Sequence, residues 1–265
     1  MKEKLFVVKI GGNVIDEEKS LTAFLEKFAA IPSKKILVHG GGKIATRIGN
    51  KLGIESKYEQ GRRITDDETI DLVTMVYGGL VNKKIVAILQ SMATDAIGLT
   101  GADANCIPAD KRPVKTIDYG WVGDIRQSDL SVKKWQIFLD NGLVPVASPL
   151  THDSKCHILN TNADTIASSL AVLLSEAYDV RLIYCFEKTG VLEDVANESS
   201  VIPVITRVGY VQLLADNKLF EGIIPKIDNA FAAIESGVSA VIIGNADDLI
   251  RNTGDETLGT VIVKE

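Results

Sequence analysis

Short runs of aliphatic and β-branched residues alternate with helical stretches along most of this chain. The runs that we expect to form strands cover residues 5–10, 35–39, 143–147, 180–184 and 239–243. The stretches that we expect to form helices cover residues 17–30, 43–52, 66–92, 129–141, 161–174, 206–217 and 225–236. Because strands that alternate with helices usually pair in parallel, this order predicts an α/β fold with a mainly parallel sheet covered by helices.

Residues 97–125 interrupt the alternation with short strands and turns punctuated by Gly and Pro, which is typical of a hairpin insertion. No Ser/Gly-rich linker, block of like charges or internal repeat divides the 265 residues. We therefore expect one domain whose two lobes share one continuous sheet, an N-terminal lobe of about residues 1–175 and a C-terminal lobe of about residues 176–265.

The charge and hydropathy of the chain exclude several classes of function. A formal net charge of -6 argues against nucleic acid as a partner, since nucleic-acid-binding proteins usually carry a clustered basic surface. The apolar run at residues 5–8 is too short for a secretory signal, and no run of about 18 apolar residues occurs. We expect a cytoplasmic protein that binds neither nucleic acid nor a membrane.

Neither the cysteines nor the histidines have the spacing of a metal site. The three cysteines are widely separated and lack the C-x-x-C pattern, so we expect buried or idle thiols: Cys106, Cys156 and Cys185. The three histidines are equally scattered, and we assign them no role: His39, His152 and His157. No protein ligand for a metal is predicted.

The first glycine-rich loop, residues 7–13, follows a strand that contains Lys9 and continues into Gly11 and Gly12. Glycines at such a position let backbone N–H groups approach an anion closely. A lysine in an apolar strand is costly unless its ammonium group reaches water or a negative partner, which a phosphate would supply. Taken alone, the loop is equally consistent with a lysine that reaches solvent above a simple turn.

The second loop, residues 36–43, again leads from a strand through glycines into a helix, whose N-terminus favours an anion. The spacing Gly40-x-Gly42-x-x-Ala45 also meets the degenerate dinucleotide-binding fingerprint, with Glu59 as its acidic residue. That match is weak, because the fingerprint normally lies in the first strand-helix unit. A Walker A loop does not fit either, since Leu37 stands where its first glycine should be.

Together, the two loops resemble those of the amino acid kinase family, whose fold is an open, three-layer αβα sandwich and whose first strand ends in a lysine followed by two glycines. Four further segments resemble the acetylglutamate kinases within that family: residues 61–65 (Gly-Arg-Arg-Ile-Thr), 159–164 (Leu-Asn-Thr-Asn-Ala-Asp), 222–226 (Gly-Ile-Ile-Pro-Lys) and 258–260 (Leu-Gly-Thr). In this order the segments cover nearly the whole chain.

The resemblance implies an enzyme that uses ATP with Mg²⁺ to phosphorylate the γ-carboxylate of an N-acyl-L-glutamate, acetyl or succinyl, in arginine biosynthesis. It implies that the N-terminal lobe binds the acylglutamate and the C-terminal lobe binds ATP. Arginine-inhibited relatives carry an extra helix before the first strand, whereas only residues 1–4 precede it here. We therefore expect an arginine-insensitive homodimer.

The resemblance also assigns the site residues. Lys9 and Lys226 are expected to be catalytic, and Asp164 is expected to lie between them and orient both ammonium groups. Phosphate binding falls to Gly11, Gly12, Gly41 and Gly42; acylglutamate binding to Gly41, Gly42, Arg63 and Asn160; nucleotide binding to Glu187, Gly190 and Lys226. Because the γ-carboxyl group, with a pKa of about 4.3, is already ionised at neutral pH, no general base is required.

The same residues could instead have purely structural roles. Asn160 and Asn162 could cap the helix that follows them, and Asp164 in its first turn could serve only the helix dipole. Arg63, in a polar stretch beside Arg62, could be a solvated charge.

The chain departs from the family pattern at two places. Residues 185–190 occupy the position of an S/T-D-V-x-G loop near the nucleotide, with Glu187 in place of the aspartate and Lys188 in place of the valine. Ala102 stands where the family often has lysine. These departures leave the reaction type intact but do not decide the acyl group.

Three alternatives remain. The chain could be another member of the family that acts on a different carboxylate, carbamate or phosphate. It could be a non-catalytic nucleotide or metabolite sensor on the same fold. It could also be a dinucleotide-dependent oxidoreductase, as the fingerprint at residues 40–45 would indicate.

Overall fold

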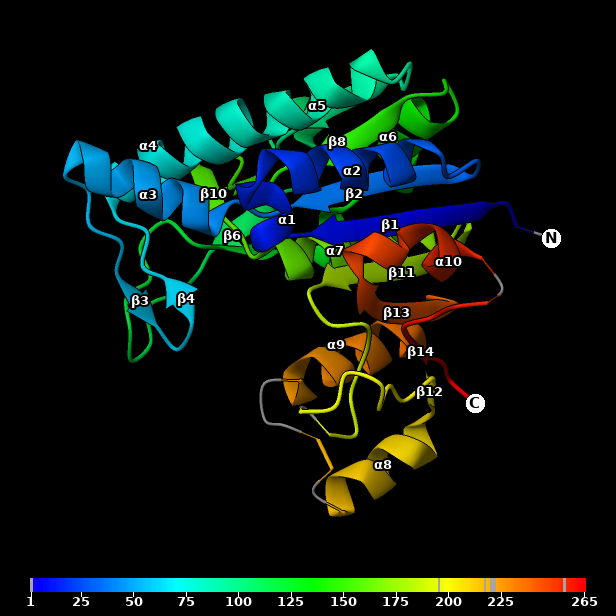
Figure 1. Cartoon of the computed structure of the whole chain (residues 1–265). Coiled ribbons are helices and arrows are strands. Elements are labelled where there is room, and N and C mark those ends of the chain that lie inside the picture. Colours follow the sequence, from blue (N-terminus) through cyan, green and yellow to red (C-terminus); the bar gives the residue numbers. More distant parts are fainter. Residues whose placement is uncertain (1, 195, 217, 220–222, 255) are drawn as a thin grey trace.

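The computed structural model describes residues 2–194, 196–216, 218–219, 223–254 and 256–265 (Figure 1). Gly222, the first residue of the 222–226 segment, and Asn217, the expected end of the 206–217 helix, lie outside these residues.

An eight-stranded sheet forms the middle layer, with the strand order β12-β14-β13-β11-β1-β2-β8-β5. Its strands are β1 (Lys4–Ile10), β2 (Lys34–His39), β5 (Ala96–Leu99), β8 (Val144–Ala147), β11 (Asp179–Phe186), β12 (Val204–Ile205), β13 (Ala240–Asn245) and β14 (Thr260–Ile262). Every neighbouring pair is parallel except β13 with β14. The predicted mainly parallel sheet is therefore confirmed, and it runs unbroken through both expected lobes.

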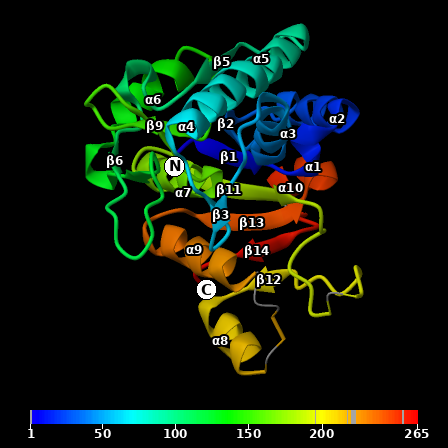
Figure 2. The same cartoon turned by 90° about the vertical axis from the view of Figure 1, so that its left-hand side faces the viewer.

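Helices cover both faces of the sheet, which gives the expected three-layer sandwich (Figures 1 and 2). One face packs against α6 (Val132–Leu139), α7 (Ala163–Leu174) and α9 (Ile224–Glu235). The other packs against α1 (Asn13–Asp16), α2 (Glu18–Ala29), α3 (Gly42–Leu52), α4 (Asp67–Val73), α5 (Asn82–Ser91) and α10 (Leu249–Thr253). The helix α8 (Arg207–Ala215) lies beyond β12 at one end of the molecule.

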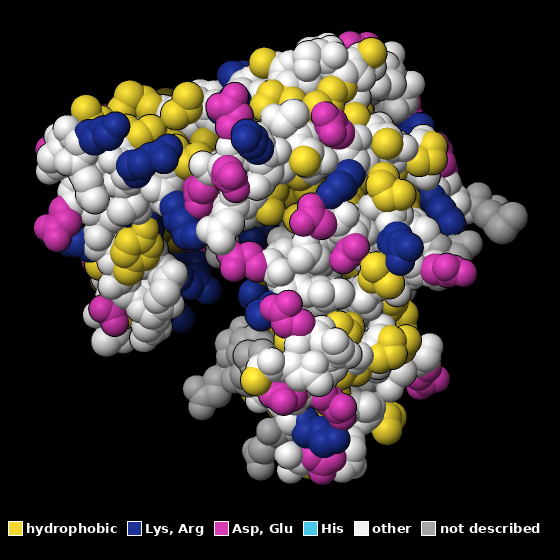
Figure 3. Space-filling model, viewed as in Figure 1, with side chains coloured by type: hydrophobic (Ala, Val, Ile, Leu, Met, Phe, Trp, Pro, Cys, Tyr) yellow, Lys and Arg dark blue, Asp and Glu magenta, His cyan; other side chains and the backbone are white. Residues whose placement is uncertain are grey.

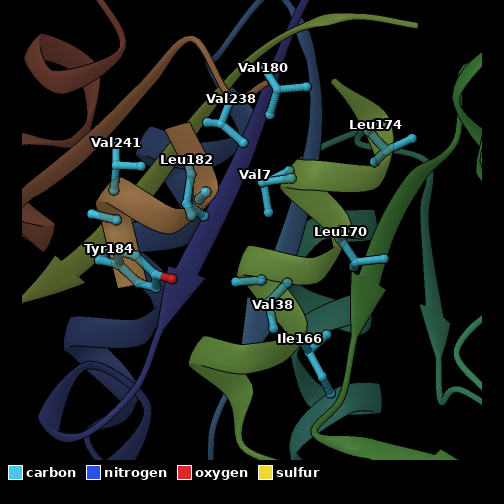
Figure 4. Packing of buried hydrophobic residues seen from close by; sticks show 14 of the residues in the cluster. Val7, Val38, Ile166, Leu170, Leu174, Val180, Leu182, Tyr184, Val238 and Val241 are labelled. Carbon is cyan, nitrogen blue, oxygen red and sulfur yellow. The ribbon is translucent and has the colours of Figure 1, made fainter. Parts of the chain in front are cut away.

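The alternation of side chains along each strand creates these two cores. In β1, Leu5 and Val7 belong to the cluster under α7, whereas Phe6 and Val8 belong to the cluster under α2. Figure 4 shows the first cluster, in which side chains of the central strands meet the inner face of α7. Because β1 is buried on both faces, its sequence is a continuous apolar run that only Lys9 interrupts, near its carboxyl end.

Side-chain caps fix the starts of several helices. Asp66 accepts a hydrogen bond from the Thr69 backbone N–H, and Thr206 accepts one from the Gly209 backbone N–H. Asn162 accepts from the backbone N–H groups of Asp164 and Thr165, so the capping interpretation of Asn162 is confirmed. That cap sets the first turn of α7 at the carboxyl edge of the sheet.

The predicted helix over residues 66–92 is one continuous helical stretch, Asp67–Ser91, with a π-helical section (Thr74–Val81) between α4 and α5. Within the described residues it alone is long and apolar enough to cross a membrane by length and composition, but its inner face packs on the sheet. Length and composition by themselves are weak grounds for a membrane span.

The interpretation of residues 97–125 as a hairpin insertion is only partly correct. Residues 96–99 form β5, an edge strand of the main sheet. Its four residues are too few to show the two-residue alternation of side chains by which a strand is recognised in a sequence. The hairpin itself is shorter and pairs β6 (Ala109–Lys111) with β7 (Gly123–Ile125). Two further small ladders pair β3 (Tyr58–Glu59) with β4 (Arg62–Arg63), and β9 (Leu150–His152) with β10 (Ile158–Asn160).

Three 3₁₀ turns lie among these elements in the described residues, and one of them overlaps an expected helix. The stretch 129–141 begins with a 3₁₀ turn (Gln127–Asp129) before α6, and two further 3₁₀ turns lie at Asp103–Asn105 and Ala246–Asp248. The edge strand β12 and its neighbour β14, which the sequence did not predict, have only two and three residues.

Candidate active site

The two glycine-rich loops lie side by side at the carboxyl edge of the sheet, because they follow the neighbouring parallel strands β1 and β2. The Gly40 backbone N–H donates to the Ile10 carbonyl oxygen at 2.9 Å. A Cβ atom on Gly40 would lie 3.6 Å from the Gly11 Cα atom, so the two backbones are in contact. The loops therefore form one continuous backbone surface.

Two of these glycines have conformations that other residues rarely adopt. Gly12 has φ 53° and ψ −135°, and Gly41 has φ 149° and ψ 11°. A Cβ atom on Gly41 would also lie 3.0 Å from the Tyr77 ring. Glycine is thus required at position 41 both by the backbone and by the space above it.

Lys9 and Asp164 meet at this edge. The strand alternation that places Leu5 and Val7 under α7 turns Lys9 toward the same helix, and its Nζ lies 2.8 Å from Asp164 Oδ1. The side chains are 12% and 31% exposed, respectively, so the pair is largely shielded from solvent. The Tyr184 hydroxyl donates to the Asp164 carbonyl oxygen at 3.3 Å and holds the same turn of α7 from below.

Lys226, in the first turn of α9, approaches Lys9 from the other side. Its Nζ lies 3.7 Å from the centroid of the Phe186 ring, while Lys9 Nζ lies 5.6 Å from the same centroid. Burial lowers the pKa of Lys226 below its usual value, an effect that the Asp164 carboxylate opposes and the Lys9 charge reinforces. Within the described ranges Asp164 forms an ion pair with Lys9 but not with Lys226, although its charge acts on both lysines.

A first cavity of about 250 Å³ lies on the side of the β3–β4 hairpin. All the residues expected to bind acylglutamate line it: Gly41, Gly42, Arg63 and Asn160. Arg62, Tyr77, Arg112 and Asn162 contribute to the same wall. Its basic side chains suit an anionic ligand.

Arg63 is buried and held in place by its neighbours, so it is not a solvated charge. Its guanidinium donates to the Gly42 carbonyl oxygen and to Thr46 Oγ1, each at 2.9 Å, and also to Ser56 Oγ. The guanidinium carbon lies 4.8 Å from the Tyr58 ring centroid. These contacts fix the planar group before any ligand arrives.

Asn160 joins two of the sequence segments that identified the site. Its side-chain N–H donates to Thr65 Oγ1 at 2.9 Å, and Thr65 is fully buried. Asn160 ends β10 and does not cap α7, because that role belongs to Asn162. On the same side, Arg112 pairs with Asp124 across the β6–β7 hairpin.

A second cavity of about 470 Å³ lies on the side of α9. The residues expected to bind nucleotide line it, together with two of the four glycines expected to bind phosphate and with Lys9: Glu187, Gly190, Lys226, Gly11 and Gly12. The other two glycines, Gly41 and Gly42, line the first cavity instead. Its apolar walls come from Val14, Leu192, Ile223 and Ile243. Figure 3 shows Lys and Arg side chains gathered in the hollow between the β3–β4 hairpin and the α8–α9 part of the molecule.

The two departures from the family pattern lie differently with respect to the cavities. Lys188 is at the edge of the second cavity, where its Nζ lies 2.7 Å from Glu198 Oε1. Glu187 Oε1 would lie 3.9 Å from a Cβ atom on Gly12, so it is close to the first loop. Ala102 is exposed in the loop after β5 and lies outside the lining of both cavities.

Two of the three cysteines are buried thiols, as expected. Cys106 and Cys185 are buried free thiols, Cys156 is an exposed one, and burial raises the pKa of Cys185 to about 12. In the part of the chain that the structure describes, no three His, Cys, Asp or Glu side chains come close enough to hold a metal ion.

Sequence reasoning missed Phe186, Tyr77 and His39. Phe186 contacts Lys226 and Tyr77 packs over Gly41, yet each is one apolar residue in an apolar element. His39 is fully buried at the end of β2 and contacts the Gly40 carbonyl oxygen. Its position directly before the glycines was the only signal available.

The family model for the amino acid kinase family matches residues 4–245. This match spans most of the chain and includes both glycine-rich loops, Asp164 and Lys226. The chain therefore belongs to the amino acid kinase family.

Comparison with individual proteins shows which members of the family this chain is similar to. The chain is 54% identical to the acetylglutamate kinase of Bacteroides thetaiotaomicron over 254 residues, which covers 96% of this chain and 98% of that protein. It is 52% identical to the acetylglutamate kinase of Phocaeicola vulgatus over 264 residues, the full length of both. Among solved structures, smu.665 of Streptococcus mutans UA159 matches with a TM-score of 0.77 and 26% identity, covering 98% of this chain and 99% of that one.

Proposed function

We propose that this protein transfers the γ-phosphoryl group of ATP to the γ-carboxylate of an N-acyl-L-glutamate. The observation that supports it most is the Lys9–Asp164 pair, in which Lys9 lines the second cavity and the neighbours of Asp164 line the first. Arg63 and Asn160 line the first, as a carboxylate-bearing acceptor requires, and Lys226 and the Gly11–Gly12 loop line the second, as a nucleotide requires. The relatives named acetylglutamate kinase support the same reaction.

In the proposed step an oxygen of the acceptor carboxylate forms a bond to the γ-phosphorus of ATP while the bond to the β,γ-bridging oxygen breaks. ADP leaves with that electron pair, and the product is an acyl phosphate. The nucleophile is already an anion at neutral pH, so no proton has to be removed. The protein's task is to position the two reactants and to place positive charge around the transferring group.

Lys9 and Lys226 are the groups that we propose for that charge. Their ammonium groups lie within one small region, at 5.6 and 3.7 Å from the same ring centroid. The backbone N–H groups of the two glycine loops would add donors to the phosphoryl oxygens. Asp164 would orient Lys9, since an ion pair of 2.8 Å fixes the direction of the ammonium group.

Arg63 is proposed to hold the α-carboxylate of the acceptor. Its guanidinium is planar and already fixed by Gly42, Thr46 and Ser56, which lowers the entropy lost when the ligand binds. Asn160 is proposed to contact the same substrate, with its amide held by Thr65. The similarity to relatives named acetylglutamate kinase favours acetyl as the acyl group.

We propose that ATP enters with Mg²⁺ and that the C-terminal lobe holds the nucleotide while the N-terminal lobe holds the acylglutamate. Mg²⁺ supplies positive charge to the phosphate oxygens and keeps several water ligands, so few protein ligands are needed. Glu187 and Gly190 would lie beside the nucleotide.

A cytoplasmic homodimer is the proposed working form, because ATP is available in the cytoplasm and the long Asp67–Ser91 helix exposes apolar side chains. Met75 is 57% and Leu80 51% exposed in its π-helical section. Light scattering should give twice the 28.6 kDa of one chain. A monomer at micromolar concentration would contradict the homodimer.

The test of the reaction is ADP release with ATP and Mg²⁺, measured in parallel with N-acetyl-L-glutamate, N-succinyl-L-glutamate and free glutamate. Turnover on one acylated glutamate, lost in Lys9→Ala, would support the reaction and identify the acyl group. Binding of ATP without turnover on any of the three would favour a sensor, and turnover on a carbamate or phosphate would favour another reaction of the family.

A further inference from the structure

The nearest partners of the two lysines at the site are chemically different, although Lys9 Nζ also lies 5.6 Å from the centroid of the Phe186 ring. Lys9 lies against the Asp164 carboxylate, whereas Lys226 lies over the face of the Phe186 ring, with 3.7 Å between Nζ and the ring centroid. This distance is well inside the range of about 6 Å in which an ammonium group is attracted to an aromatic face. The Phe186 ring is thus a direct partner of Lys226.

A ring and a carboxylate affect a lysine differently. A carboxylate neutralises the ammonium group and competes with a phosphate for the same charge. An aromatic face attracts the cation through its quadrupole but adds no formal charge. It occupies one side of the ammonium group and leaves N–H donors on the other side for phosphate oxygens.

The Phe186 ring is itself fixed. Phe186 is the last residue of β11 and pairs with Asn245 of β13, inside the parallel sheet. Its ring stacks on Tyr184 with centroids 6.2 Å apart and an interplanar angle of 27°. The Tyr184 hydroxyl in turn contacts the Asp164 carbonyl oxygen, so the partners of both lysines are connected through one strand.

Burial makes this support important for Lys226. Partial burial of its ammonium group lowers the pKa of Lys226 and favours the neutral amine; the Asp164 carboxylate opposes this effect and the nearby Lys9 charge reinforces it. A neutral amine would contribute little to stabilising phosphoryl oxygens. The ring offsets part of this penalty while leaving the charge accessible to a ligand in the second cavity, whose wall includes both Phe186 and Lys226.

We propose that Phe186 is a positioning residue for phosphoryl transfer, whose ring holds the charged Lys226 side chain toward the phosphate end of the nucleotide cavity. The inference rests on the proposed kinase function and deepens it. It predicts that Phe186 acts through Lys226 and not through the fold or the nucleotide itself.

The test is a double-mutant cycle of Phe186→Leu, Lys226→Ala and the double variant, with Phe186→Tyr as the conservative variant that keeps the ring. With the acylglutamate that the wild type uses best, Phe186→Leu should lower kcat about tenfold and change the KM for that acceptor little. In the Lys226→Ala background the same substitution should change kcat by less than about twofold. Phe186→Tyr should stay within about threefold of the wild type.

Two results would overturn the proposed role of Phe186. An equal effect of Phe186→Leu in both backgrounds would overturn the inference, because the ring would then act independently of Lys226. An unchanged kcat would overturn it too. Melting temperatures of all five proteins exclude loss of folding as the cause.

Failure of the proposed function would look different, since the wild type would then turn over no acylglutamate. The same cycle is in that case read from the Kd of ATP with Mg²⁺, measured by calorimetry without an acceptor. A loss of affinity in Phe186→Leu that disappears in the Lys226→Ala background supports the inference, and equal losses in both backgrounds overturn it.

Discussion

Lys9 and Asp164, with 2.8 Å between Nζ and Oδ1, join the end of the central strand β1 to the first turn of α7. Lys9 can point this way because strand alternation sends every second residue of β1 to the α7 face. Asp164 can meet it because the Asn162 cap starts α7 at the carboxyl edge of the sheet. Lys9 lines the second cavity, and Ala163 and Thr165, the neighbours of Asp164, line the first, so the pair connects the walls of the two cavities.

Asp164→Asn should lower kcat by at least about tenfold with little loss of folding stability, because the amide keeps the shape but no longer orients the Lys9 ammonium by charge. The measurement is steady-state ADP release together with thermal unfolding. A matched control is Asp247→Asn, which breaks an exposed pair with Lys27 of similar length, 2.7 Å. Surface pairs contribute little, so the control should leave kcat unchanged, and equal losses in both variants would contradict the assignment.

Arg63→Lys should raise the KM for the acylglutamate by roughly 10- to 100-fold and change kcat less, because lysine cannot reproduce the planar, two-pronged contact with a carboxylate. The measurement is a KM and kcat determination at saturating ATP. Arg207→Lys is the matched control, since Arg207 also stacks on a ring, with 4.9 Å from its guanidinium carbon to the Phe231 centroid, but is exposed. An unchanged KM in Arg63→Lys would remove Arg63 from the substrate site.

Much of this site could be predicted because its residues belong to short segments anchored to regular elements. Lys9 follows from the apolar strand that it interrupts, and the glycines follow from the turns after β1 and β2. Arg63 and Asn160 lie almost 100 residues apart, yet Thr65 brings them together through a hydrogen bond to Asn160. Resemblance placed both of them correctly in one cavity, although neither periodicity nor composition could have done so.

What could not be predicted depends on contacts between distant elements. Phe186 ends a buried strand, where an aromatic residue is expected in any case, and its contact with Lys226 arises only when α9 folds over β11. The edge strands β5 and β12 have four and two residues, and β14 beside β12 has three, which is too few for a periodic pattern. Asp164 was expected to lie between two lysines, and the ion pair with Lys9 could be anticipated, but the position of α9 also brings Lys226 onto the Phe186 ring, which the sequence did not indicate.

Gly41→Ala should destabilise the protein by about 1–3 kcal/mol and abolish most activity, because alanine is strained at φ 149° and its Cβ would press on Tyr77. The measurement is chemical denaturation combined with ADP release. Gly79→Ala is the control, since a Cβ at that position meets nothing within 4 Å and the residue is helical. Alanine there should be neutral or slightly stabilising. A fully stable and active Gly41→Ala variant would show that the loop relaxes easily.

The buried histidine before the second glycine loop makes the stability of the fold depend on pH. His39 Nδ1 lies 2.7 Å from the Gly40 carbonyl oxygen, and Asn82 Nδ2 lies 3.1 Å from His39 Nε2. The neutral ring satisfies both contacts only with the proton on Nδ1, which donates to Gly40 while Nε2 accepts from Asn82. Burial lowers the pKa of His39 from 6.5 to about 4.

The unfolded chain therefore takes up a proton at position 39 below about pH 6.5, whereas the folded protein does so only near pH 4. Between these values the unfolded state binds more protons, so the free energy of unfolding falls as the pH falls. The difference corresponds to on the order of 3 kcal/mol for this one group. His39→Gln removes the titration, and its free energy of unfolding should fall less steeply across this range.

The check is urea denaturation of the wild type and His39→Gln at several pH values from 8 to 4. The carboxylates and the other histidines titrate in both proteins, so their effects cancel in the difference between the two free energies of unfolding. His39→Gln should be the less stable protein at pH 8, because it loses contacts to Gly40 and Asn82. The gap between the two proteins should narrow as the pH falls toward 4. A gap that stays constant would mean that His39 is protonated in the folded state at the same pH as in the unfolded chain.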